Sequence, residues 1–286
     1  MTRRAAAVLL VTLAACGSDA VRVGGKNFTE QRILGELVAQ TLEDAGLTVE
    51  RRLDLGGTFV CDAALRAGQI DVYVEYTGTA LTAILKEAPI GDPRAALERV
   101  RAGYAPAGLV WTAPLGFDNT FALVVRPDAG VRTISEAAAK APGWVAGFGY
   151  EFQQRPDGYP GLARAYGLAF RDVKTMDLGL LYRALAERQV DLVAGNATDG
   201  LIAALGLLAL ADDRRFFPPY EAVPLVRRAA LERHPALEPT LRTLAGTLDA
   251  ATMRRLNHRV DGERVDPATV VREFRATRAS ATTPGR

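Results

Sequence analysis

From residue 21 onward, short β-type apolar runs alternate with longer runs of helical periodicity. The pattern predicts strands at 21–24 and 48–53, with a helix at 29–44 between them. A helix ending at Ala67 and a strand at 70–76 follow. Strand and helix in regular alternation predict an α/β fold built around parallel strands.

The same alternation resumes in the second half, where strands are predicted at 121–125, 144–148 and 190–194. From 225 to 278 the pattern is mainly helical, with helices at 250–257 and 267–277. We expect this terminal region to return and pack on the first half of the chain.

A short internal repeat links the two halves. Leu65, Gln69, Ile70, Asp71 and Val72 match Leu185, Gln189, Val190, Asp191 and Leu192 at a constant offset of 120 positions. Two lobes of one plan would explain the repeat, and chance is the alternative. In this alignment Tyr76 corresponds to Asn196, and both end predicted strands. Because open α/β sheets bind ligands at the carboxyl ends of their strands, both residues are expected to face one cleft.

Two rigid segments, 114–120 and 216–220, separate the halves and predict a double hinge. The predicted division is a leader at 1–16, lobe 1 at 21–117 and 218–286, and lobe 2 at 118–217. The predicted fold class is therefore α/β, with two lobes and a ligand cleft between them.

The first residues predict export. Arg3 and Arg4 precede an apolar stretch at 5–15 that is too short to span a bilayer. The segment 13–16 resembles a bacterial lipobox, which makes Cys16 the expected lipidation site and the lipid the only membrane anchor. An ordinary secretory signal that contains a Cys is the alternative. Without Cys16 only Cys61 remains, so an intramolecular disulfide is excluded.

Composition argues against several classes of function. The chain has 286 residues and a formal net charge of only +2, with its basic residues dispersed, so no nucleic-acid surface is predicted. The two histidines, His234 and His258, lie in the helical terminal region, which leaves a hydrolytic triad without a base. No Cys/His cluster predicts a metal site. We therefore expect no catalytic residues, no metal and no cofactor.

Two features predict a small-molecule site. The loop before the helix at 29–44 carries Lys26 and suits an anion such as a ligand carboxylate, although a tight turn capped by Thr29 is the plainer interpretation. Aromatic residues also gather at predicted strand ends and connections, namely Tyr76, Phe117, Phe121, Tyr150, Phe152 and Tyr220. Aromatic faces bind quaternary ammonium groups, which have no N–H to donate, whereas core packing is the alternative for each residue.

An ordered set of motifs resembles one known family. The motifs are GKNFTEQ at 25–31, DVYVEYTGT at 71–79, GFDNTF at 116–121, YEF at 150–152, RPDG at 155–158, MDLGL at 176–180, GNATDG at 195–200, FFPPY at 216–220 and LNHRVDG at 256–262. Over 21–277 the chain resembles the glycine betaine, choline and proline betaine binding proteins of ABC importers, especially the OsmF/YehZ-like branch.

The resemblance implies a type II periplasmic-binding-protein fold and a non-catalytic binding role. It also implies delivery of an osmoprotectant to a membrane permease with its ATPase. We expect a monomeric, exported lipoprotein, in a periplasm or on the outer face of the cell membrane.

Carried over by position, the resemblance makes Tyr76, Phe121 and Tyr220 the walls of an aromatic cage for the ammonium group. Lys26, Thr79 and Arg155 would hold the carboxylate. The predicted site also includes Asn119, Asn196 and Asp199, and Phe117 as an alternative to Phe121. Full-cage relatives carry an aromatic where this chain has Asn196, and Tyr at Phe121. We therefore expect weaker binding of simple betaines, or a ligand that hydrogen-bonds Asn196.

Two other functions stay open at this point. An amino-acid receptor would pair Asp118 or Asp199 with the ligand's α-ammonium and Arg155 with its carboxylate. A periplasmic enzyme on the same fold would be revealed by turnover.

Overall fold

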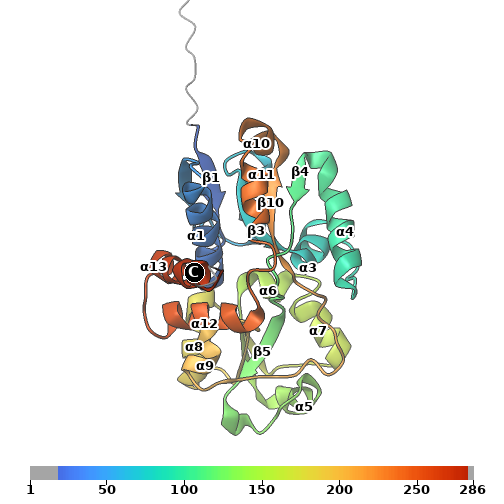
Figure 1. Cartoon of the computed structure of the whole chain (residues 1–286). Coiled ribbons are helices and arrows are strands. Elements are labelled where there is room, and N and C mark those ends of the chain that lie inside the picture. Colours follow the sequence, from blue (N-terminus) through green and yellow to red (C-terminus); the bar gives the residue numbers. More distant parts are fainter. Residues whose placement is uncertain (1–18, 283–286) are drawn as a thin grey trace, which may run out of the picture.

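Residues 19–282 are described by the computed structural model, in which two α/β lobes lie one above the other (Figure 1). The predicted leader and Cys16 lie outside the described residues. Within residues 19–282, no helix is both long and apolar enough to cross a membrane.

Lobe 1 contains a five-stranded sheet in the order β2-β1-β3-β10-β4. Strand β1 (Val21–Gly24) pairs in parallel with β2 (Val49–Arg52) and β3 (Val72–Tyr76). Strand β10 (Ala222–Arg227) comes back from the far end of the chain and lies antiparallel between β3 and β4 (Leu109–Trp111). The helices of this part are α1 (Thr29–Asp44), α2 (Thr58–Arg66), α3 (Thr77–Thr79) with a π-helical turn at Ala80–Ile84, and α4 (Pro93–Tyr104) with a 3-10 turn at Ala105–Ala107.

Lobe 2 repeats this topology, with the strand order β7-β6-β8-β5-β9. Its strands are β5 (Phe121–Val125), β6 (Val145–Phe148), β7 (Asp172–Thr175), β8 (Leu192–Asn196) and β9 (Leu208–Ala209). Its helices are α5 (Ile134–Lys140), α6 (Tyr150–Gln154), α7 (Tyr159–Tyr166), α8 (Leu178–Ala186) and α9 (Gly200–Ala204), with 3-10 turns at Pro127–Ala129 and Ala141–Gly143. The connections 112–120 and 210–221 cross between the sheets, and the predicted lobe boundaries lie within them.

The C-terminal helices are α10 (Arg228–Arg233), α11 (Leu237–Arg242), α12 (Ala250–Asp261) and α13 (Pro267–Thr282). Helices α11, α12 and α13 all pack on α1, and α12 also contacts α9 of lobe 2. In Figure 1 these helices descend beside α1 toward α8 and α9. The end of the chain therefore joins both lobes.

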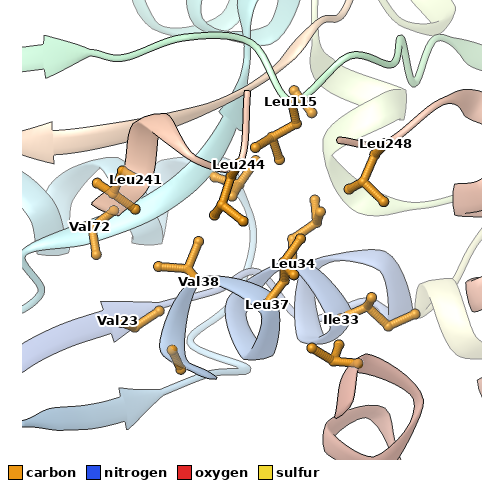
Figure 2. Close-up of a cluster of buried hydrophobic side chains, with 14 of the residues drawn as sticks. Val23, Ile33, Leu34, Leu37, Val38, Val72, Leu115, Leu241, Leu244 and Leu248 are labelled. Carbon is orange, nitrogen blue, oxygen red and sulfur yellow. The ribbon is translucent and has the colours of Figure 1, made fainter. Parts of the chain in front are cut away.

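Helix α1 is buried on several sides because apolar residues surround most of it. Leu34 and Val38 are buried in one cluster with Val72 of β3 and with Leu241 and Leu244 of the C-terminal region. Figure 2 shows these side chains converging from α1, the sheet and the C-terminal segment. Burial of such apolar surface supplies the main stabilisation of lobe 1 and holds the first turn of α1 in place.

The internal repeat corresponds to one structural device used twice. Asp71 precedes β3, and its Oδ2 accepts a bond of 3.0 Å from the backbone N–H of Arg22. Asp191 precedes β8, and its Oδ2 accepts a bond of 2.9 Å from the backbone N–H of Val145. Each carboxylate therefore joins two neighbouring parallel strands at the same point of its lobe.

Two predictions need correction. The sheets are mixed rather than purely parallel, because β10 and β5 run antiparallel to β3 and β8. The stretch that begins at 225 was predicted as mainly helical, but its first residues belong to β10. Pro224 has no N–H to donate, and its carbonyl instead accepts bonds from the N–H and the hydroxyl of Thr112. The partners that make β10 a strand are far away in sequence, so local periodicity does not reveal them.

The two aspartates should differ in their effect on stability. The Asp71 side chain is fully buried and contacts Arg22, Arg227 and Arg233, whereas that of Asp191 is 30% exposed. Burial disfavours ionised Asp71, but the bonds from Arg22 outweigh it and lower the pKa of this carboxyl. We expect Asp71→Ala to reduce the free energy of unfolding by about 3–5 kcal/mol and Asp191→Ala by about 1 kcal/mol. Urea unfolding of both variants measures the difference, and equal losses would contradict this account.

Candidate ligand-binding site

A cavity of about 310 Å³ lies between the lobes at the carboxyl ends of their central strands. Tyr76 at the end of β3 and Asn196 at the end of β8 both line it. The other residues around it are Lys26, Asn27, Phe28, Gly57, Thr58, Thr79, Asn119, Phe121, Gly149, Tyr150, Glu151, Phe152, Arg155, Asp177, Leu178, Ala194, Gly195 and Tyr220. Both lobes and both connections therefore contribute to the wall, as a site that closes around its ligand requires.

Aromatic rings form much of the wall. The lining includes Phe28, Tyr76, Phe121, Tyr150, Phe152 and Tyr220. The Phe121 ring lies with its centroid 4.9 Å from that of Phe152 and 5.5 Å from that of Tyr220. The rings of Phe28 and Tyr76 stack at 6.5 Å between centroids. A cation held in this cavity would meet π faces from both lobes.

The orientation of Tyr76 is fixed by helix α1. Its hydroxyl accepts a bond of 3.0 Å from Gln31 Nε2 and donates one of 2.7 Å to Glu30 Oε1. Burial, followed by the nearby Glu30 carboxyl, keeps the pKa of Tyr76 well above its ordinary value, so the phenol is neutral. The consecutive pair Glu30-Gln31 therefore positions an aromatic wall of the cavity.

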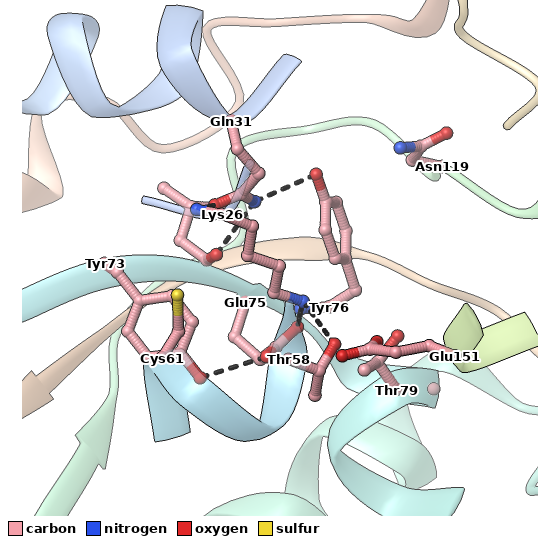
Figure 3. A network of polar contacts seen from close by, with 12 residues as sticks. Lys26, Gln31, Thr58, Cys61, Tyr73, Glu75, Tyr76, Thr79, Asn119 and Glu151 are labelled. Carbon is pink, nitrogen blue, oxygen red and sulfur yellow. Dashed lines mark hydrogen bonds and ion pairs between the residues drawn. The ribbon is translucent and has the colours of Figure 1, made fainter. Parts of the chain in front are cut away.

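Lys26 lies beside the cavity in a buried ion pair. Its Nζ is 2.6 Å from Glu75 Oε1 and 3.1 Å from Thr58 Oγ1, and Glu75 also accepts a bond of 3.0 Å from Tyr73. Figure 3 shows this group, with the lysine side chain running past Tyr76. Two of the three ammonium protons are used inside the protein, so at most one remains for a ligand carboxylate.

Arg155 is held in a similar way by a residue that the sequence motif contains but whose role was not predicted. Asp157 accepts from Arg155 Nε at 2.9 Å and from Nη2 at 2.5 Å, and Tyr220 donates to the same carboxylate at 2.7 Å. Burial opposes ionisation of Asp157, but its bonds with Arg155 outweigh it and lower the pKa. Nη2 also donates to Thr79, whereas among residues 19–282 the one polar contact of Nη1 is with Glu151 at 3.9 Å. The Nη1 group is thus the part of the guanidinium available to a ligand.

Eight of the ten residues predicted for the site line the cavity, and Phe117 and Asp199 are not among the lining residues. Phe117 is buried in the main cluster of lobe 1. Asp199 lies behind Asn196, where it accepts bonds from the backbone N–H of Asn196 at 2.8 Å and from the Tyr182 hydroxyl at 2.6 Å. Asp118 is also absent from the lining and accepts from the backbone N–H of Tyr220. The two carboxylates considered for an amino-acid receptor, Asp118 and Asp199, are therefore engaged elsewhere.

The family model described as "Substrate binding domain of ABC-type glycine betaine transport system" matches residues 19–277. The chain belongs to this family. It is 38% identical to the glycine-betaine-binding protein of Pseudomonas aeruginosa over 272 residues, 90% of this chain and 87% of the relative. It is 34% identical to the carnitine transport binding protein OpuCC of Listeria monocytogenes, covering 92% and 88%.

Solved structures agree with the family assignment. A crystal structure of a glycine betaine/carnitine/choline ABC transporter shares 32% identity with this chain and superimposes with a TM-score of 0.73, covering 91% of this chain and 98% of the other. The predicted family and two-lobed α/β fold are confirmed, and membership of a glycine betaine transport family favours the quaternary-ammonium interpretation over the amino-acid alternative.

Some lining residues of this substrate-binding domain were not among the predicted site residues. Phe28, Glu151 and Asp177 each lie within a motif that marks the family, but none of them was among the residues predicted for the site. Thr58 lies at the start of α2 outside those motifs, and its hydroxyl contacts Lys26. The position of a side chain relative to the opposite lobe is what decides which motif residues reach the cavity.

Breaking the buried Lys26–Glu75 ion pair should destabilise the protein. Both side chains are nearly inaccessible, at 4% and 0% exposed. Glu75→Gln would leave a buried ammonium without its carboxylate, and we expect the free energy of unfolding to fall by about 3–5 kcal/mol. Adding Lys26→Met should recover part of that loss, because the uncompensated charge is removed. Urea unfolding of the single and double variants measures the effect, and a double variant less stable than Glu75→Gln would contradict it.

Proposed function

We propose that this chain captures a small quaternary-ammonium compound of the glycine betaine or carnitine type in the interlobe cavity. The observation that carries the proposal is the set of aromatic rings around a cavity of about 310 Å³. This volume is at the small end of the range of about 300–1,000 Å³ for small-molecule pockets. Each π face offers about 0.5–2 kcal/mol to a desolvated cation, and the curated relatives named above are described as binding glycine betaine or transporting carnitine.

The charges around the cavity suit a ligand with both signs of charge. Lys26 and Arg155 are neutralised by Glu75 and Asp157, so the wall has no strong net positive field. Arg155 Nη1 is still available to a carboxylate, and Thr79 lies next to it. Glu151 and Asp177, also on the wall, favour a cationic group. A zwitterion can place its carboxylate near Arg155 and its ammonium among the rings.

Asn196 bears on which compound is preferred. Its backbone N–H and side-chain amide are both near Asp199, with Nδ2 3.3 Å from Oδ1, and its amide replaces an aromatic face. Phe28, Tyr150 and Phe152 enlarge the aromatic wall beyond the three rings expected from the sequence. We infer that a ligand with an additional hydroxyl, as carnitine has, binds better than glycine betaine because it can hydrogen-bond Asn196.

The role that we propose is conformational rather than catalytic. A ligand that contacts both lobes favours the closed form, which an ABC permease and its ATPase would then recognise. The leader at 1–16 supports export, with Cys16 as the lipid anchor of a monomeric protein outside the cytoplasmic membrane.

Calorimetry with glycine betaine, carnitine, choline and common amino acids tests the proposal on the protein without residues 1–16. Phe121→Leu keeps most of the side-chain volume but removes a π face, and we expect it to weaken quaternary-ammonium binding by about 0.5–2 kcal/mol, roughly 2- to 30-fold. Phe170→Leu is the matched control, because Phe170 packs on Phe148 and Tyr159 and is not among the cavity residues. Binding of amino acids alone would contradict the proposal.

A further inference from the structure

Glu30 is a buried carboxyl at the junction of the two lobes. It lies on α1 of lobe 1 and is only 1% exposed. Its polar neighbours come from four other segments: Tyr76 of β3, Asn119 of the first connection, Thr198 after β8 in lobe 2, and Asn257 of α12. Tyr76 and Asn119 separate it from the cavity, so it is positioned to respond to closure without touching the ligand.

The hydrogen bonds around Glu30 require one proton more than a carboxylate provides. Thr198 Oγ1 lies within hydrogen-bond distance of both Glu30 Oε2 and Asn119 Oδ1, the latter at 2.7 Å. A hydroxyl has one proton, so Thr198 can donate to only one of these oxygens. The Asn119 amide oxygen has no proton, so Thr198 must donate to it, and the contact between Thr198 and Glu30 Oε2 then needs a proton on Glu30.

Reversing the Asn119 amide does not remove this requirement. Asn119 Nδ2 is 2.7 Å from Glu30 Oε1, and in the reversed orientation its oxygen would occupy that place. Two acceptor oxygens would then face each other unless Glu30 is protonated. In both orientations of the Asn119 amide, the contacts among Glu30, Asn119 and Thr198 require a protonated Glu30 carboxyl.

The other hydrogen bonds of Glu30 also fit a protonated carboxyl. The Tyr76 hydroxyl accepts from Gln31, so its proton is directed to Glu30 Oε1, which also accepts from Asn119. Oε1 thus acts as the carbonyl oxygen and Oε2 as the protonated oxygen beside Thr198. Burial raises the pKa of the Glu30 carboxyl to about 7 against the opposing bond from Tyr76, and the Asp199 carboxylate adds to the rise.

Other titratable groups lie on the elements around this junction. They are Asp199 after β8 and Tyr182 bonded to it, Asp261 and His258 on α12, Tyr76 on β3, and Lys26 over the Tyr76 ring. Lys26 is neutralised by Glu75. Asp199 would repel a second carboxylate, which further favours an uncharged Glu30.

We propose that Glu30 is a proton-binding site of the closed protein, and that closure on a ligand takes up one proton from solvent at Glu30 Oε2. The bond to Thr198 joins lobe 1 to lobe 2 and requires the acid, whereas an open cleft would admit water and leave Glu30 ionised. This inference rests on the proposed function, because it makes capture of the ligand depend on pH.

The direction of the pH effect on affinity follows from the pKa of Glu30 in the closed and in the open form. In this structure, which we take as the closed form because Glu30 of lobe 1 contacts Thr198 of lobe 2, the Glu30 carboxyl has a pKa of about 7, above the ordinary 4.5. The proton's contribution to closure is therefore complete below about pH 4.5 and is lost as the pH rises through about 7. From pH 6 to pH 8 we expect affinity to fall about tenfold, and proton uptake to fall from about 0.9 to about 0.1 per ligand bound.

Calorimetry at pH 6 and pH 8, in pairs of buffers with different ionisation enthalpies, counts the protons. Glycine betaine, carnitine and choline are suitable probes because none of them titrates in this range. Glu30→Gln supplies an acceptor oxygen for Tyr76 and a donor for Thr198, so we expect it to bind at pH 6 without proton uptake and without the pH dependence.

Glu36→Gln is the matched control. Glu36 lies on the same helix and is buried, but it contacts Gln40 and Arg51 away from the lobe junction, so both proton uptake and pH dependence should persist. Binding without proton uptake at pH 6, or uptake that persists in Glu30→Gln through Asp199 or His258, would overturn this inference and leave the proposed function intact. If none of the three compounds binds at either pH, the proposed function fails and this inference with it.

Discussion

The site depends on the pairing of buried charges beside aromatic rings. Lys26 Nζ lies 5.0 Å from the centroid of the Tyr76 ring, and the Arg155 guanidinium lies 5.0 Å from that of Phe121. Each cation is held by a carboxylate, which compensates the cost of its burial. The pairs therefore support two walls of the cavity without giving it a charge that would repel a quaternary ammonium.

The repeated topology explains why the site is at the lobe junction. Both sheets use the same strand order, and Asp71 and Asp191 join equivalent strands, so the carboxyl ends of β3 and β8 meet at one cavity. The lobes then differ where they meet the ligand, because Tyr76 ends β3 and Asn196 ends β8. A common scaffold with different residues at its strand ends can hold the two unlike ends of a zwitterion.

The sequence predicts local elements well and long-range contacts poorly. Periodicity alone predicts α1, β1 and β5 to the residue, since each has a clear apolar pattern between turn residues. It misses β10, whose strand character depends on β3 and β4 and which contains Pro224. The motifs contain most of the residues that line the cavity, but the role of Asp157 and the position of Phe117 depend on side-chain direction. The partners of Glu30 lie between 46 and 227 positions away, so only the folded chain reveals them.

Charge recognition by aromatic rings is the central claim, and a neutral isostere of the ligand tests it most directly. In 3,3-dimethylbutyrate, carbon replaces the nitrogen of glycine betaine, so shape and carboxylate are kept while the positive charge is lost. Competitive calorimetry on the protein without residues 1–16 would compare the two compounds. The account predicts that glycine betaine binds at least tenfold more tightly, a difference of about 1.4 kcal/mol or more. Equal affinities would contradict it, because shape and the carboxylate alone would then explain binding.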